Sequence, residues 1–227
     1  MFETKSGIFL IAGLGFFLLA FLSNGVVPWL MYAHLPEKSV EQMVEEQAND
    51  VNRSRTVLAE FRDLRDRYPE AFAKLFGEPT NANCAAALRE GRRIYIGEGC
   101  WHCHSQFVRP VSNEERRWGP VSQSWEYQNE LQRPVMFGTR RVGPDLSREG
   151  GRRSNDWHVV HFFRPRMTSP RSVMPDYPWF FDDNTRDGPG SPNRRGFAII
   201  TYMQWLGSWL ENYPHYHDPD YPPRPGR

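Results

Sequence analysis

The sequence has little cysteine, little lysine and almost no net charge. Its 227 residues include three cysteines, three lysines against 25 arginines, and charges that sum to +1. Three cysteines cannot build a disulfide framework, because an odd number always leaves one unpaired. A nearly neutral chain also lacks the strong positive charge with which proteins bind nucleic acid. We therefore exclude a disulfide-stapled scaffold and expect no nucleic-acid partner.

Regular sheet is also expected to be scarce. The chain holds 18 glycines and 19 prolines, and such a composition predicts a loop-rich fold. The length is sufficient for one or two domains with a real hydrophobic core.

One long hydrophobic run stands out near the N-terminus. Residues 7–32, GIFLIAGLGFFLLAFLSNGVVPWLMY, contain no charged side chain. As a helix this run would be about 39 Å long, enough to cross a hydrocarbon core of roughly 30 Å. A signal peptide fits poorly, because the run is too long and no cleavage site with small residues follows. We expect residues 1–35 to be a single-span anchor in lipid. Within the span, Asn24 is equally consistent with contact to another helix and with wetting by headgroups.

The rest of the chain divides into three segments. From residue 36 to 80, apolar residues recur among charged ones at spacings typical of a helix, with Pro69 marking a break: Val40, Val44, Val51, Leu58 and Phe61. We interpret 36–80 as an amphipathic helical linker that carries no chemistry. Residues 81–212 form the expected folded domain, and residues 213–227 are a Pro-rich tail with too few apolar residues for a core.

The strongest chemical signal is Cys100-Trp101-His102-Cys103-His104. This C-x-x-C-H spacing is the attachment signature of c-type haem, in which both thiols form thioethers with the porphyrin and the histidine binds the iron. A redox-active C-x-x-C motif would require a βαβ context, which is absent. A zinc site would need Cys84 as a further ligand at an unusual spacing. We expect one covalently attached haem c.

The flanking segments resemble the class I cytochrome c fold, which is all-α with long loops around one haem. Gly91 and Tyr95 lie on one face of a short helix before the motif, and residues 196–210 form an apolar closing helix that includes Tyr202. Between them, Gly143-Pro144-Asp145-Leu146 looks like the loop whose proline carbonyl accepts the Nδ1 proton of the proximal histidine. By this resemblance, Pro144 would orient His104.

The sixth iron ligand remains open between several residues. Met174 precedes Pro175 in a stiff extended segment and is the preferred ligand, with Met167 as a second candidate. Met203 is expected to pack in the core, and an open or His-ligated iron is the remaining alternative.

An arginine close to the motif has two candidate roles. Arg109 comes five residues after His104, and its planar guanidinium suits a carboxylate. We expect Arg109 to contact a haem propionate or a neighbouring subunit.

Several runs together resemble the mono-haem cytochrome c subunit of cbb3-type cytochrome c oxidases, the FixO/CcoO family. They are CWHCHSQFVRP, ERRWGPVS, GTRRVGPDLSREGGRRSNDWHVVHFFRPR and SVMPDYPWF, within roughly residues 85–210. Carried over to this chain, the resemblance makes Cys100 and Cys103 the attachment sites and His104 and Met174 the iron ligands. Trp157, His158 and His161 match the W-H-x-x-H helix of the family.

The resemblance implies an electron-transfer subunit that is not itself catalytic. It would receive electrons from another cytochrome c subunit and pass them to the b-type haems of a multi-span catalytic subunit. The haem domain would lie on the periplasmic side of the bacterial inner membrane. Two alternatives are a stand-alone membrane-anchored carrier and the cytochrome c subunit of a nitric oxide reductase.

Overall fold

The computed structural model describes residues 2–34, 36–50 and 56–208. The chain divides into an N-terminal unit, residues 1–37, and a second unit that begins at residue 38. Each unit is described by itself. The expected Pro-rich tail, 213–227, and the last residues of the expected 81–212 domain lie outside the described residues.

The N-terminal unit is one long apolar helix. It consists of α1 (Phe2–Phe21), a π-helical turn η1 (Leu22–Val26) and α2 (Val27–Tyr32). The stretch Thr4–Tyr32 is long and apolar enough to cross a membrane, and none of the residues in its most apolar part is buried in the structure. It fits a single-pass membrane anchor. Asn24, which the sequence left ambiguous, donates from Nδ2 to the Ala20 carbonyl oxygen at 3.0 Å within the same helix.

Residues 36–80 differ from the linker predicted from the sequence. They contain three helices, α3 (Val40–Asn49), α4 (Val57–Arg67) and α5 (Pro69–Phe76). Ser39 and Thr56 cap the first two, and Pro69 starts the third at a position where its missing N–H costs nothing.

The apolar faces of these three helices belong to the main core rather than to a spacer. Val40, Phe61 and Phe72 are fully buried in the same cluster as the closing helix. The Phe61 and Phe72 rings meet edge to face at 4.8 Å, and Phe72 meets Phe197 at 5.5 Å. The amphipathic pattern was therefore correct, but the partner of its apolar face is the domain itself.

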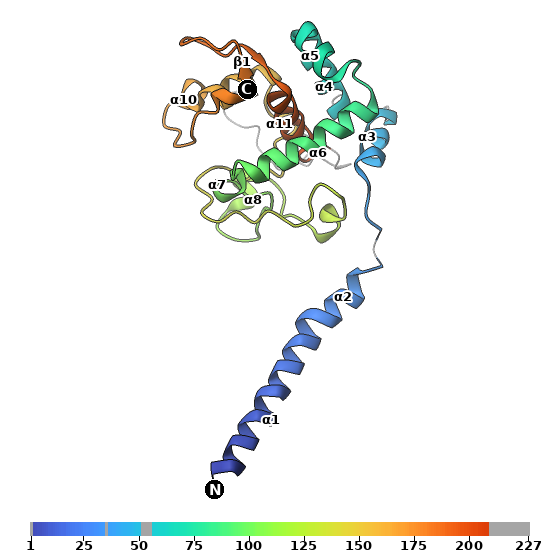
Figure 1. The fold of residues 1–227 in the computed structure, drawn as a ribbon, viewed down its shortest axis with the longest axis vertical. Coiled ribbons are helices and arrows are strands. Elements are labelled where there is room, and N and C mark those ends of the chain that lie inside the picture. Colours follow the sequence, from blue (N-terminus) through green and yellow to red (C-terminus); the bar gives the residue numbers. More distant parts are fainter. Residues whose placement is uncertain (1, 35, 51–55, 209–227) are drawn as a thin grey trace. The chain divides into compact units, whose positions relative to one another are not determined.

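Two crossing helices form the centre of the second unit, α6 (Asn81–Gly97) and α11 (Arg194–Trp205) (Figure 1). They meet at Gly91, where a Cβ atom would lie 2.2 Å from the Ala198 carbonyl oxygen. Close to this crossing, the rings of Tyr95 and Tyr202 lie 5.7 Å apart. Both helices that the resemblance implied are present, and the helical content confirms the predicted all-α class.

Long loops with short helices complete this unit. They contain α7 (Cys100–Cys103), α8 (Glu114–Trp118), η2 (Ser124–Tyr127), α9 (Asn155–Phe163), α10 (Pro165–Thr168) and η3 (Pro178–Phe180). In the described part of the chain, the sheet is limited to one antiparallel pairing of β1 (Phe181–Asp182) with β2 (Ser191–Pro192).

Candidate haem site

A cavity of about 940 Å³, mostly apolar, opens beside the end of α6. That volume lies within the range of cofactor-binding cavities, roughly 300–1,000 Å³. Its walls come from α6 and α7, the loop after residue 141, α9, the loop before η3, and α11. The lining side chains include Tyr95, Cys100, Cys103, His104, Val142, Pro144, Leu146, Trp157, His158, His161, Phe162, Met174, Tyr177 and Met203.

The C-x-x-C-H motif occupies one wall of this cavity. After α6 ends, Gly99 adopts a left-handed conformation with φ of 70°, and the single turn of α7 follows. Both Cys100 and Cys103 are free thiols that line the cavity, and His104 follows them. Burial raises the pKa of the Cys100 thiol to about 12, so this thiol is protonated at neutral pH. His102 is not among the lining residues, and its Nδ1 lies 3.1 Å from Oγ1 of Thr139.

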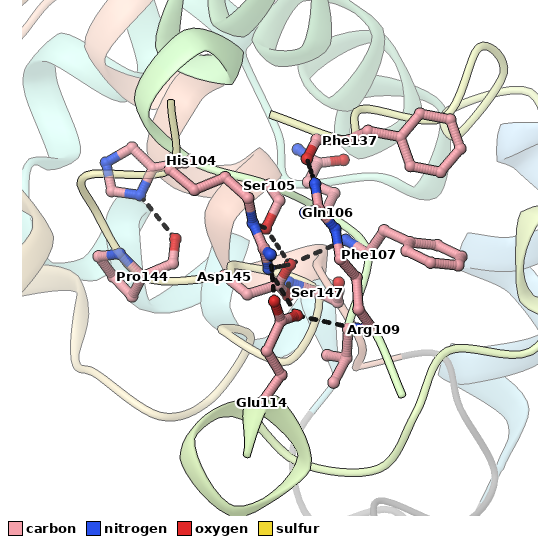
Figure 2. Close-up of polar contacts among 12 residues, drawn as sticks. His104, Ser105, Gln106, Phe107, Arg109, Glu114, Phe137, Pro144, Asp145 and Ser147 are labelled. Atoms are coloured by element: carbon pink, nitrogen blue, oxygen red, sulfur yellow. Dashed lines mark hydrogen bonds and ion pairs between the residues drawn. The ribbon is translucent and has the colours of Figure 1, made fainter. Parts of the chain in front are cut away.

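The imidazole of His104 is oriented by the loop that the sequence singled out. Its Nδ1 donates to the Pro144 carbonyl oxygen at 2.9 Å (Figure 2). Burial lowers the pKa of His104, although the Pro144 contact opposes this effect. A neutral ring that donates through Nδ1 carries its lone pair on Nε2, which is the atom available to a metal.

Gly143 permits the close approach of this loop to the ring. A Cβ atom at residue 143 would lie 2.3 Å from Cε1 of His104. Any larger residue would therefore displace either the loop or the imidazole. The contact with His104 therefore explains why the GPDL segment has glycine at its first position, which the sequence alone does not explain.

Asp145 fastens the same loop to the segment that follows His104. Its carboxylate accepts hydrogen bonds from the Ser105 hydroxyl, from the Phe107 N–H at 2.8 Å and from the Ser147 N–H at 2.9 Å. Asp145 is 2% exposed, and Figure 2 shows it between the two chain segments. Because Asp145 follows Pro144 directly, these contacts hold the carbonyl that orients His104.

A partly buried ion pair extends this network. Arg141 forms two hydrogen bonds with the Glu114 carboxylate, of which Nη2 to Oε2 measures 2.7 Å, and its Nε donates to Ser105 Oγ at 2.8 Å. Burial raises the pKa of Glu114, but the bonds from Arg141 and from the Arg109 backbone N–H outweigh this effect, so the pKa lies below its usual value.

This pair gives a pH-dependent prediction. Glu114→Gln should reduce the free energy of unfolding at pH 7 by about 1–3 kcal/mol, because a charge-assisted pair becomes a weaker one. A carboxyl whose pKa is lowered on folding stabilises the protein above its unfolded pKa, near 4.5, and loses that contribution as the pH falls. Denaturant titrations should show the gap between wild type and variant closing below pH 4.5. A gap that stays constant, or an equal loss in the exposed control Glu70→Gln, would contradict this assignment.

The candidate sixth ligands lie in different places. Met174 lines the cavity and packs against the core, whereas Met167 is 49% exposed and is not a lining residue. Met203, expected in the core, is 4% exposed and also reaches the cavity wall. Of the two methionines preferred from the sequence, the structure brings Met174 into the site and leaves Met167 outside it.

The structure does not bring Arg109 to the cavity. Its guanidinium donates to the Phe137 carbonyl oxygen at 3.0 Å, and the residue is not among those that line the cavity. The propionate role predicted for Arg109 is therefore not supported. Closeness to His104 along the chain does not fix direction, and the chain turns away after Phe107 to meet Glu114. The arginine that does line the cavity is Arg171.

Three aromatic residues of α9 form a wall whose role the sequence reasoning did not assign. Trp157, His158 and His161 all line the cavity, and the Trp157 and His161 rings stack at 4.3 Å. His158 is 2% exposed, and its Nε2 has no hydrogen-bond partner among the described residues. The W-H-x-x-H spacing was the available signal.

The structure does not support the alternative of a zinc site. Cys84 is fully buried in the α6 core. Across the described ranges, no group of three or more His, Cys, Asp or Glu side chains is placed to hold a metal ion.

The site does fit a c-type haem. Two thiols and a histidine with its Nε2 free share one cavity with a methionine thioether, and the walls are mostly apolar. The buried Nε2 of His158, which has no hydrogen-bond partner among the described residues, leaves a polar position in this wall for a bound group.

Comparison with known proteins adds the family. A family model described as cytochrome c oxidase, mono-heme subunit/FixO matches residues 80–188, the part of the chain that supplies most of the cavity. No curated protein matches the chain. The match confirms the resemblance found in the sequence: residues 80–188 match the FixO family of mono-haem cytochrome c oxidase subunits, a family that implies one haem.

Proposed function

We propose that this chain is the membrane-anchored electron-entry subunit of a cbb3-type oxidase, with one haem c attached through Cys100 and Cys103. The observation that carries the proposal is the arrangement around His104. Its Nδ1 is held by the Pro144 carbonyl, and the two cysteines of the attachment signature share its cavity.

The chain's own residues would place and protect the group. Thioethers at Cys100 and Cys103 would attach the haem, and His104 Nε2 and the Met174 sulfur would bind its iron. The haem would supply a one-electron carrier whose potential is raised by Met/His ligation. The apolar walls would exclude water from the iron.

The family match and the N-terminal helix support a proposal for the partners and the location. A mono-haem subunit of an oxidase would take electrons from another cytochrome c subunit and pass them to a multi-span subunit that contains b-type haems. The apolar helix Thr4–Tyr32 supports a single-pass anchor. We place this anchor in the bacterial inner membrane, with the haem domain on the periplasmic side. Oxygen would be reduced in the catalytic subunit, since both His104 and Met174 would bind the iron proposed here.

Purification in mild detergent tests this function. The tagged, full-length chain should emerge with a larger subunit whose absorption spectrum contains b-type haem, and the complex should consume oxygen when supplied with reduced cytochrome c. If the chain emerges as a lone c-type cytochrome, it is a stand-alone carrier. If the complex reduces nitric oxide rather than oxygen, it belongs to a nitric oxide reductase. Either result would overturn the proposal.

A further inference from the structure

The W-H-x-x-H motif on α9 has no part in haem attachment or in the proposed axial ligation. It nevertheless places Trp157, His158 and His161 in the cavity wall. Ser154 caps the helix by accepting from the Trp157 N–H at 3.2 Å, so the first turn of α9 is well defined.

His158 is the residue of this wall whose buried Nε2 has no hydrogen-bond partner among the described residues. Its side chain is almost fully buried, and no described residue accepts from or donates to its Nε2. Burial, together with the nearby His161 and Arg153, lowers the pKa of His158 to about 3, so the ring is neutral at pH 7 and carries one N–H. A buried polar atom without a partner costs about 1–3 kcal/mol, so we expect a group other than the described residues to meet it.

The neighbouring groups favour an anionic partner. His161 already has a partner, because its Nδ1 lies 2.6 Å from Thr168 Oγ1, whose own hydroxyl donates to the Pro165 carbonyl. The Arg153 guanidinium lies over the Trp157 ring at 5.0 Å, and Arg171 lines the cavity. The lining also contains the carboxylates Glu98 and Glu149, but the charged side chain that acts on His158 is the Arg153 cation.

We propose that His158 is a haem-positioning residue whose Nε2–H donates to a propionate carboxylate of the haem. This inference rests on the proposed function, since the haem must be present for a propionate to be there. An ionised carboxylate only accepts hydrogen bonds, so it is the right partner for an N–H donor. A carboxylate held in a largely apolar cavity also requires such donors. His158 thus takes one of the two roles that the sequence predicted for Arg109, the contact with a propionate.

The experiment uses the full-length protein with three replacements of His158. In His158→Gln, the amide nitrogen can occupy the place of Nε2, whereas in His158→Asn it corresponds to Nδ1, and His158→Leu has no donor. The haem potential would be measured by redox titration. Infrared difference spectra between the oxidised and reduced forms, with 13C in the propionate carboxyl carbons, would report on the carboxylate itself.

We expect the Leu and Asn variants to have a lower potential and shifted 13C carboxylate bands. Without the donor, more negative charge stays on the propionate and stabilises ferric iron. His158→Gln should remain close to wild type in both measurements. If the Leu variant does not accumulate, the difference in potential and carboxylate bands between the Gln and Asn variants tests the proposal.

Two outcomes would overturn the inference. Unchanged potential and bands in the Leu and Asn variants would mean that Nε2 meets a buried water or nothing. Equal changes in all three variants would mean that the ring only fills space. Haem stain and the low-spin spectrum of each variant separate these outcomes from a failure of the proposed function. That failure would appear as a wild-type protein without covalent haem.

Discussion

Replacing Cys100 and Cys103 together with alanine should abolish covalent haem attachment. The wild-type chain, boiled in denaturing detergent, should keep haem peroxidase stain at its own mass of 26.6 kDa, because thioether bonds survive denaturation. The double variant should show none. Each single variant should retain weakened attachment through the remaining thiol. Both thiols line the cavity, one at each end of the single turn of α7, so neither can take over the role of the other.

Cys84 provides a matched control for this result. It is a free thiol, fully buried in α6, and is not among the cavity-lining residues. Cys84→Ala should keep full haem stain. If the wild-type chain loses its stain on boiling, or if the stain survives in the double variant, the haem c assignment is wrong.

Replacing Met174 with leucine should convert the iron from low spin to high spin and allow it to bind carbon monoxide. The thioether is a soft ligand that stabilises ferrous iron, so its loss should also lower the potential. Leucine has a similar volume, which keeps the packing of Met174 against the core almost unchanged. Absorption spectra with and without carbon monoxide, together with a redox titration, measure these effects.

Met167→Leu is the control for the axial ligand. Its side chain is exposed and does not line the cavity, so the spectrum and the potential should match those of the wild type. If Met167→Leu instead abolishes the Met–iron charge-transfer band and Met174→Leu preserves it, the ligand assignment is reversed.

The features that the sequence could predict depend on short, local patterns. The attachment motif and the amphipathic periodicity of residues 36–80 are both contiguous. The structure places both thiols and His104 of the motif in one cavity and buries the apolar faces of α3 and α4. Family resemblance supplied the contact between His104 and Pro144, which lie 40 positions apart. Periodicity alone would not have paired these two residues.

The features that the sequence could not predict depend on where a side chain points and on which residue it contacts. An apolar helix face indicates that the face is covered, but it does not indicate which element covers it. Helices α3 to α5 were therefore assigned to a spacer. Arg109 was placed at the haem because of its position in the chain, whereas its side chain points to Phe137. The pairing of Arg141 with Glu114 joins two charges from separate loops, and no local pattern marks it.

The packing of helices α3 to α5 into the core has a consequence for obtaining the domain without its membrane helix. The family match begins at residue 80, which suggests a natural starting point for a soluble fragment. A fragment that starts there would lack Val40, Phe61 and Phe72, and would leave the buried face of Phe197 open to solvent. Exposed apolar surfaces of this kind lead to aggregation. The smallest autonomous form of this domain therefore begins ahead of Val40, and the first forty residues of its fold lie outside the part that identifies the family.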